Sequence, residues 1–312
     1  MKTKAAVVLL FVVLGLAGMT TAAHAAHSNY ATANKPIQFG LTAVVVRENL
    51  RLLDVWAQYL SDRMGQPVEF VQRRSYREVM DMLGSGGLDF AWICGFPFVQ
   101  KRDPEFVELL LVPVYQGKPL YRSYIIVHRD SPYQSMDDLA GKIFAFSDPE
   151  SNSGYLYPQF FLANQGDRPE TYFHKTFFTF NHAETVEAVA EQVADGGAVD
   201  SYIWEYLREF QPEVADKTRV IQKSPTFGFP PLVSRLGADP DMVERMKAVL
   251  MGMSSSPDGR VLLDALKLDG FGEFSPSLFD SIRDMAAETR KARPWIEAAE
   301  EKEKELRAEE IE

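Results

Sequence analysis

The sequence predicts an α/β fold of two lobes, each built on a sheet covered by helices. Short apolar runs alternate with segments of helical periodicity along most of the chain. A length of 312 residues usually means two lobes or domains. Packed cores must stabilise both lobes, because Cys94 is the only cysteine and no intramolecular disulfide can form. The hydrophobic fraction of 46% is sufficient for such cores.

The first lobe is predicted from a β-α-β-α-β series. Apolar runs predict strands at 37–45, 68–72 and 88–94, and periodic segments predict helices at 48–65 and 75–87. Gly65 closes the first helix, and Ser75 caps the second before a glycine stop. Strands joined by helices in this way favour a parallel sheet with covering helices.

The second lobe is expected after a hinge crossing. Two apolar runs, 109–115 and 121–127, flank a turn at Gly117. The later pattern predicts a short helix and a strand before residue 148, a helix at 182–197, a strand running into a helix at 198–207, and a strand at 218–225. A return crossing to the first lobe follows, with a strand at 231–235 and a helix capped near Asp239. We therefore expect lobe 1 at 36–121 and 223–288, and lobe 2 at 122–222.

The two ends of the chain are expected to lie outside the lobes. Residues 1–25 have the basic start, the apolar run and the small residues of a cleavable secretory signal peptide. An uncleaved membrane anchor is the alternative, but the apolar run falls short of the ~20 residues that a spanning helix needs. Residues 289–312 are charge-dense and largely acidic, which is typical of a solvated tail; a docking helix for a partner is the alternative.

The charge of the chain argues against some classes of partner. The formal net charge is −11, and it becomes −13 once Lys2 and Lys4 leave with the signal peptide. This sign disfavours binding of DNA, RNA or anionic lipid through a basic surface. The rest of the chain has no apolar stretch long enough for membrane insertion. If the ligand is an anion, a local site must hold it.

The turn Ser151-Asn152-Ser153-Gly154 is the strongest candidate for such a site. It follows an apolar strand and opens a helix, with Pro158 expected near the first turn. Free backbone N–H groups and side-chain donors then gather at the positive end of a helix dipole, where they can hold an oxyanion without a formal positive charge. Plain helix capping is the alternative, since Ser and Asn are favoured at helix starts for local reasons.

Other side chains are candidates for the same site. His182 precedes a periodic segment and could donate to an anion, with a surface or capping role as the alternative. Asp200 lies in an apolar run, where it either pairs with structural N–H groups or accepts a proton carried by the ligand. Tyr76 and Tyr121 lie near the predicted lobe boundaries, and such phenols either donate to a ligand oxygen or pack in a core.

Motifs for catalysis are weak. No Gly-x-Ser-x-Gly occurs in a nucleophile-elbow setting, and no His-Glu-x-x-His occurs. Cys94 lies in the apolar context AWICGF, which predicts burial rather than reactivity. No nucleophile, base and orienting group can therefore be named from the sequence.

Several segments resemble the periplasmic substrate-binding proteins of ABC importers for phosphonate, phosphite and phosphate, the PhnD-like family. The segments at 88–99, 120–158 and 181–207 follow the order of the family's blocks, and SDPESNSG at 147–154 is similar to its most specific signature. The resemblance covers roughly residues 37–285. Asn152 stands where a threonine is usual, and the CGFP run that begins at Cys94 replaces a small polar segment.

The resemblance implies a type II periplasmic binding protein, with a mixed sheet in each lobe and a ligand cleft between the lobes. It implies a binding set that consists of Ser151, Asn152, Ser153, Gly154, His182, Asp200, Tyr76 and Tyr121. It also implies a periplasmic monomer, not an enzyme, that carries a small phosphorus oxyanion to an ABC permease of the inner membrane without cofactor or metal. Alternatives are the same fold binding a sulfonate or an organic metabolite, the ligand-sensing subunit of a signalling system, and a periplasmic enzyme.

Overall fold

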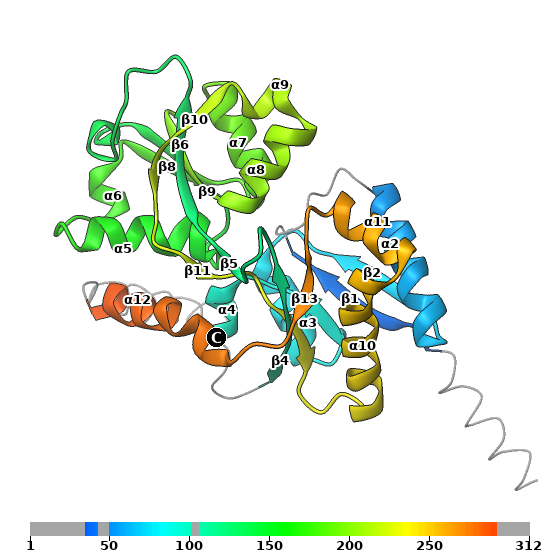
Figure 1. Ribbon diagram of the computed structural model, residues 1–312. Coiled ribbons are helices and arrows are strands. Elements are labelled where there is room, and N and C mark those ends of the chain that lie inside the picture. The colour runs from blue at the N-terminus through cyan, green and yellow to red at the C-terminus, as the bar shows by residue number, and fades with distance from the viewer. Residues whose placement is uncertain (1–34, 43–49, 101–105, 292–312) are drawn as a thin grey trace, which may run out of the picture.

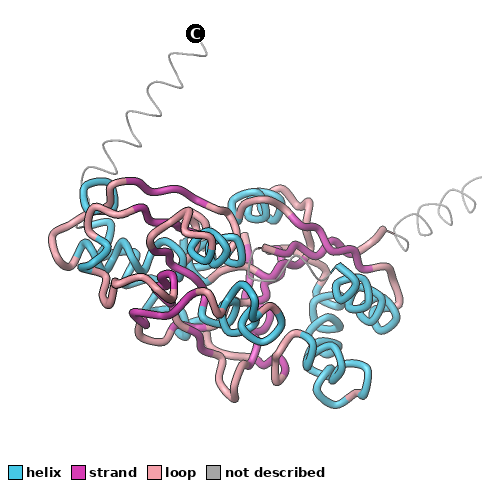
Figure 2. Tube along the Cα trace, turned by 90° about the horizontal axis from the view of Figure 1, so that it is seen from above, coloured by secondary structure: helices cyan, strands magenta, loops and turns pink. Residues whose placement is uncertain are grey.

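The chain forms two α/β lobes that lie beside each other (Figure 1). The computed structural model describes residues 35–42, 50–100 and 106–291. Lobe 1 surrounds a six-stranded sheet and lobe 2 a five-stranded sheet. Seen from above, the helices of each lobe lie against its strands (Figure 2). The predicted two-lobed α/β fold is confirmed.

The sheet of lobe 1 is mixed. Its strand order is β13-β4-β12-β3-β1-β2. The strands are β1 (Ile37–Leu41), β2 (Val68–Gln72), β3 (Phe90–Trp92), β4 (Val107–Val114), β12 (Leu232–Arg235) and β13 (Gly270–Gly272). β1 pairs in parallel with β2 and β3, as the β-α-β-α-β series predicts. β12, which returns from lobe 2, runs antiparallel to both β3 and β4.

Helices surround this sheet, and α2, α3 and α10 pack directly on its strands. The helices are α2 (Leu50–Met64), α3 (Tyr76–Gly84), α4 (Gly95–Gln100), α10 (Pro240–Gly252), α11 (Pro257–Ala265) and α12 (Asp280–Lys291), with short η3 (Met253–Ser255) and η4 (Pro276–Phe279). Ser75 caps α3 as predicted, because its side chain accepts the N–H of Glu78. Trp56 of α2 is fully buried, and its ring packs edge-on against Trp92 of β3.

Lobe 2 is built on the sheet β10-β6-β9-β7-β8. The strands are β6 (Ser123–His128), β7 (Ile143–Phe146), β8 (Lys175–Phe178), β9 (Gly196–Asp200) and β10 (Thr218–Lys223). Its helices are η1 (Asp137–Leu139), η2 (Asn152–Leu156), α5 (Tyr157–Ala163), α6 (Pro169–Tyr172), α7 (His182–Ala190), α8 (Ser201–Phe210) and α9 (Pro212–Ala215). α7 ends at Ala190, earlier than the predicted helix, because Gln192 adopts a positive φ of 58°; Gly196 and Gly197 then pair in β9.

Two crossing segments join the lobes and lie side by side. β5 (Leu120–Tyr121) pairs antiparallel with β11 (Phe227–Gly228) in a small separate ribbon. Tyr121 is therefore held at the crossing itself. The exact lobe boundaries that the sequence suggests remain a prediction.

α12 touches both lobes, since it packs on α4 of lobe 1 and on α5 and η2 of lobe 2 (Figure 1). Thr289, where the charged tail was predicted to start, is a buried residue of this helix. Residues 292–312 of that tail, and the predicted signal peptide, lie outside the described residues. Among the helices of the described residues, none is both long and apolar enough to cross a membrane.

Candidate ligand-binding site

The polar turn that the sequence singles out is a helix start, as predicted. Residues 152–156 form one turn of π-helix, η2, that continues into α5. Ser151 is the N-cap, and its Oγ accepts the backbone N–H of Gly154 at 2.9 Å. The backbone N–H of Leu156 donates to the carbonyl of Ser151, which is the wide π-type spacing. Helix capping therefore accounts for part of the turn.

Pro158 leaves one carbonyl of the turn free to bond to the sheet of lobe 2. It lies in the first turn of α5, as predicted. Proline has no N–H, so it cannot donate to the carbonyl of Ser153 five residues earlier. The hydroxyl of Ser123 in β6 donates to this carbonyl instead, at 2.6 Å. The helix start is thus anchored on the sheet.

Capping does not account for two buried oxygens of the turn. Asn152 and Ser153 have no exposed surface, yet among the described residues Oδ1 of Asn152 has no hydrogen-bond partner, and Oγ of Ser153 has none at normal hydrogen-bond distance, although the hydroxyl of Tyr121 lies near it. A buried polar atom without a partner costs about 1–3 kcal/mol. Such a cost is expected where a ligand supplies the missing partner.

Lobe 1 faces this turn with three side chains. Tyr76 begins α3, Cys94 follows β3, and Tyr121 lies in β5. The amide Nδ2 of Asn152 donates to the hydroxyl of Tyr121 at 3.0 Å, and its backbone N–H donates to the sulfur of Cys94 at 3.2 Å. The two lobes therefore meet directly at the predicted site.

His182 is wholly buried, which contradicts the alternative of a surface histidine. It is the first residue of α7, and its Nδ1 accepts the backbone N–H of Asp200 at 3.1 Å. The ring proton must then be on Nε2, which lies 3.2 Å from the hydroxyl of Tyr76 and 3.4 Å from Oγ of Ser151. Burial lowers the pKa of His182 to about 3, so the imidazole is neutral and presents an N–H donor.

Asp200 lies at the end of β9 and caps α8. Its carboxylate accepts the backbone N–H of Tyr202 at 2.7 Å and that of Ile203 at 3.4 Å. The first of the two predicted alternatives, pairing with structural N–H groups, is therefore present. Burial raises the pKa of Asp200 to about 7, so the carboxyl is partly protonated near neutral pH.

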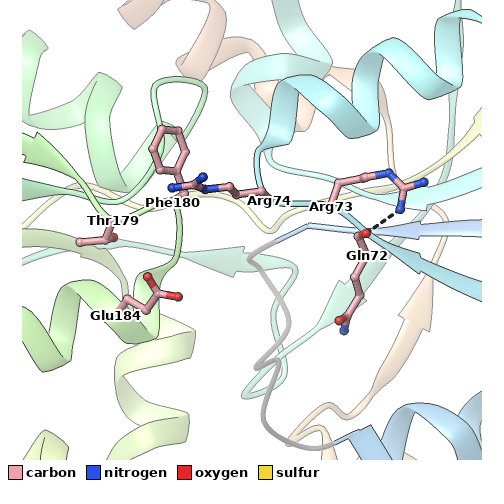
Figure 3. Close-up of a pocket in the computed structure, with 6 residues that line it drawn as sticks. All are labelled: Gln72, Arg73, Arg74, Thr179, Phe180 and Glu184. Atoms are coloured by element: carbon pink, nitrogen blue, oxygen red, sulfur yellow. Dashed lines mark hydrogen bonds between the residues drawn. The ribbon is translucent and has the colours of Figure 1, made fainter.

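A cavity of about 560 Å³ opens between the lobes next to this cluster. Figure 3 shows its lining, with Arg74 from lobe 1 reaching toward Phe180 of lobe 2. The guanidinium lies 5.5 Å from the centre of the Phe180 ring. The lining residues are Gln72, Arg73, Arg74, Thr179, Phe180 and Glu184. None of the eight predicted residues lines this cavity. Arg74 stands two positions before Tyr76, however, and Phe180 stands two positions before His182.

Sequence reasoning missed two members of the cluster, Cys94 and Asp148. The carboxylate of Asp148 accepts the backbone N–H of Tyr76 across the lobes at 3.1 Å and that of Glu150 at 2.7 Å. Burial raises the pKa of Asp148 to about 6. Cys94 follows the carboxyl end of β3, and Asp148 follows that of β7. Open α/β sheets bind their ligands at the carboxyl ends of their strands, so this position is the signal that could have found both residues.

The predicted absence of a metal site can be compared only with the described residues. Within 35–42, 50–100 and 106–291, no group of three His, Cys, Asp or Glu side chains is placed to hold a metal ion. The expected absence of metal and cofactor stays a prediction.

Comparison with known proteins relates the chain to one family of transport proteins. The family described as "ABC transporter, phosphonate, periplasmic substrate-binding protein" matches residues 39–279. The phosphonates-binding periplasmic protein of Escherichia coli is 24% identical over 260 residues, which cover 81% of this chain and 76% of that protein. A phosphate-import protein of Mycolicibacterium smegmatis is 32% identical over 117 residues, 36% of each chain.

Solved structures support the same fold. The binding-protein component of an ABC phosphonate transporter from Pseudomonas aeruginosa superposes with a TM-score of 0.78 at 24% identity, covering 83% of this chain and 88% of that one. PhnD1 of Prochlorococcus marinus, solved with methylphosphonate, gives a TM-score of 0.73 at 18% identity, with 82% and 99% covered. With its mixed sheets, its two crossings and its match over residues 39–279, the chain belongs to the periplasmic substrate-binding proteins of phosphonate ABC transporters.

Proposed function

We propose that this protein captures a small phosphorus oxyanion, a phosphonate, phosphite or phosphate, by closing its lobes around it. The observation that carries the proposal is the helix start at Ser151–Gly154. It is buried against lobe 1, and two of its atoms have no partner among the described residues: Ser153 Oγ, which can donate to an oxyanion, and Asn152 Oδ1, which can accept from a P–OH group. The names of the relatives, which include phosphonate, phosphate and phosphite binders, support the same ligand class.

The cluster suits an anion although none of the eight proposed residues is a lysine or arginine. Hydroxyls of Ser151, Ser153 and Tyr76 and the Nε2–H of His182 are neutral donors. The helix from Asn152 to Ala163 adds the positive end of its dipole. Fixed neutral donors recognise the geometry of the oxygens, so that release requires only the opening of the lobes.

Closure is coupled to binding through contacts that cross the cleft. The backbone N–H of Tyr76 donates to Asp148, Asn152 donates to Tyr121, and Arg77 pairs with Glu150 at 3.2 Å. Each contact joins lobe 1 to lobe 2 close to the proposed ligand. A ligand that bridges the same surfaces shifts the population toward the closed form.

The tautomer of His182 supports binding rather than catalysis. Ser151 and His182 are a serine and a histidine within 3.4 Å, as in a hydrolase. A catalytic histidine must accept the serine proton on its near nitrogen. Here that nitrogen, Nε2, carries the proton because Nδ1 accepts an N–H, and the low pKa leaves little basicity. The pair is therefore a donor set and not a nucleophile with its base.

The cellular role follows from the family. The family consists of periplasmic proteins of ABC transporters. We extend this to a mature monomer that is released by removal of residues 1–25 and delivers its ligand to an inner-membrane permease without a cofactor.

Calorimetry on the purified mature chain tests the proposal. We expect saturable binding of at least one of phosphite, methylphosphonate and phosphate, and a matching rise in melting temperature, since a ligand that binds only the native state stabilises it. Sulfate, a sulfonate and an amino acid serve as controls. Binding of a control with no response to any phosphorus anion would assign the fold to another solute.

A further inference from the structure

Cys94 lies at the centre of the proposed site rather than in a remote core. It is 1% exposed, and its sulfur lies 3.2 Å from the backbone nitrogen of Asn152 and 3.9 Å from the hydroxyl of Tyr121. A charge on Cys94 raises the pKa of Tyr76, and the charge of Asp200 raises the pKa of Cys94. The sulfur thus lies within electrostatic reach of residues from both walls of the site.

The sulfur takes up a donor that the helix start would otherwise offer. The N–H of Asn152 points at Cys94, and the N–H of Gly154 points at Ser151. Burial raises the pKa of the Cys94 thiol to about 11, so the sulfur carries a proton and no charge at neutral pH. A thiol is a weak hydrogen-bond donor and behaves as a small apolar group when buried.

The strong donors lie elsewhere in the cluster. Ser151, Ser153 and His182 belong to lobe 2, while Cys94 approaches the same helix start from lobe 1. Oδ1 of Asn152 and Oγ of Ser153, both buried and without a partner among the described residues, independently mark this place as one that a ligand completes. The hydroxyls of Tyr76 and Tyr121 add donors from the side of lobe 1, so the sulfur of Cys94 is a soft, apolar point among these polar groups.

The site also limits the size of a ligand. Tyr76, Tyr121, Cys94 and Asp200 are at most 3% exposed, and Ser151, Asn152, Ser153 and His182 have no exposed surface. A large substituent on the phosphorus would have to displace some of these side chains while the lobes are closed.

Resting on the proposed function, we propose that Cys94 determines ligand choice by facing the fourth substituent on phosphorus. Three oxygens meet the donors, and the sulfur accommodates a hydrogen atom or a methyl group. The site accordingly prefers phosphite and methylphosphonate to phosphate, whose fourth oxygen would lose its water partners at the sulfur without gaining a hydrogen bond of comparable strength.

Calorimetry with phosphite, methylphosphonate and phosphate tests this on the wild type, Cys94→Ser and Cys94→Ala. The wild type should bind at least one three-oxygen anion about tenfold or more tightly than phosphate, as one lost hydrogen bond to a charged group would give. Cys94→Ser supplies a hydroxyl for the fourth oxygen, so the preference should fall about tenfold. Cys94→Ala removes the acceptor of the Asn152 N–H and so frees this donor for the fourth oxygen, and the preference should fall as well.

The outcomes separate the two proposals. If the wild type binds none of the three anions, the proposed function fails and this inference with it. If the wild type prefers neither phosphite nor methylphosphonate to phosphate by about tenfold, or if Cys94→Ser binds with an unchanged preference, only the role of Cys94 is overturned. Should Cys94→Ser not fold, Cys94→Ala decides the matter, and an unchanged preference in that variant overturns the role of Cys94.

Discussion

Nδ1 of His182 accepts the backbone N–H of Asp200 across 3.1 Å, and this one contact fixes what the imidazole can do. The proton is confined to Nε2, which faces Tyr76 and Ser151. A residue at the start of α7 is thereby made into a neutral donor at the place where the lobes meet.

The first prediction separates the two nitrogens of this ring. The side-chain oxygen of asparagine can take the place of Nδ1, so His182→Asn should keep the partner of the Asp200 N–H and lose only the Nε2–H donor. We expect an affinity loss of about tenfold or more with a small change in stability. His182→Ala should lose both contacts, with a further loss of about 1–3 kcal/mol in the free energy of unfolding. Equal affinity in His182→Asn and wild type would remove the histidine from the ligand set.

The second prediction concerns Asp200 and pH. Its pKa is raised from 3.8 to about 7 in the fold, so the folded state holds a proton that the unfolded state releases, and this contribution to stability falls as pH rises from about 4 to 7. The lowered pKa of His182 acts with the opposite sign, since its contribution is lost as pH falls from 6.5 toward 3. The two slopes oppose each other in the wild type.

Asp200→Asn keeps an oxygen to cap α8 but cannot titrate. The free energy of unfolding, measured by urea denaturation between pH 4 and 6.5, should therefore rise more steeply with pH than in the wild type. The difference between the two curves should reach roughly 2–4 kcal/mol across the interval to pH 7. We also expect a changed preference between monoanions and dianions. Identical pH profiles of stability and of binding would count against any titration of Asp200.

The third prediction tests the helix start. Ser151→Ala with Ser153→Ala should weaken binding of a phosphorus oxyanion by about tenfold or more, because two neutral donors are removed. Ser256→Ala is a matched control: Ser256 also caps a helix by accepting the N–H of a glycine three residues later, at 3.1 Å, but in α11. Both changes should cost about 1 kcal/mol of cap stability. Unchanged affinity in the double variant, measured by calorimetry, would contradict the proposed site.

The fourth prediction concerns Gly154, where a side chain has no room. An added Cβ would lie 2.6 Å from Cβ of Ser147 and 3.1 Å from Cε1 of His182. Gly154→Ala should therefore lower the free energy of unfolding by about 1–3 kcal/mol and displace the imidazole, weakening binding. Gly252→Ala, at the end of α10 with no atom within 4 Å of the new Cβ, should leave stability and binding nearly unchanged. Thermal melts and calorimetry of this pair provide the check, and similar behaviour of the two variants would refute it.

The fifth prediction concerns Phe180 at the mouth of the cleft. It holds a positive φ of 60°, and the hydroxyl of Thr179 fixes this turn by donating to the carbonyl of Asn181 at 2.7 Å. Phe180→Ala should weaken ligand binding about two- to fivefold, since the cation–π contact with Arg74 across the lobes is lost. Phe180→Gly should bind the ligand as Phe180→Ala does. Its free energy of unfolding should be about 1–2 kcal/mol higher than that of Phe180→Ala, because glycine adopts this φ without strain. Wild-type affinity in both variants would show that the contact adds nothing to closure.

Local signals in the sequence were sufficient for most of the fold. The β-α-β-α-β series, the Ser75 cap and the helix start at Ser151 depend on residues a few positions apart, so their patterns can be read directly. Short elements with weak patterns, such as β8, α6 and β13, were not predicted, because pairing with neighbouring strands or packing defines them rather than periodicity.

The sequence by itself determined the two-lobed α/β class, the anion-type helix start at Ser151–Gly154 and the resemblance to phosphonate-binding proteins. Only the tertiary structure decided that Tyr76 meets His182 from 106 positions away and that Cys94 meets the N–H of Asn152. It also decided the proton position of His182, because that depends on which nitrogen the Asp200 N–H reaches. Capping and periodicity act over a few residues, whereas these contacts exist only because two crossings bring one lobe against the other.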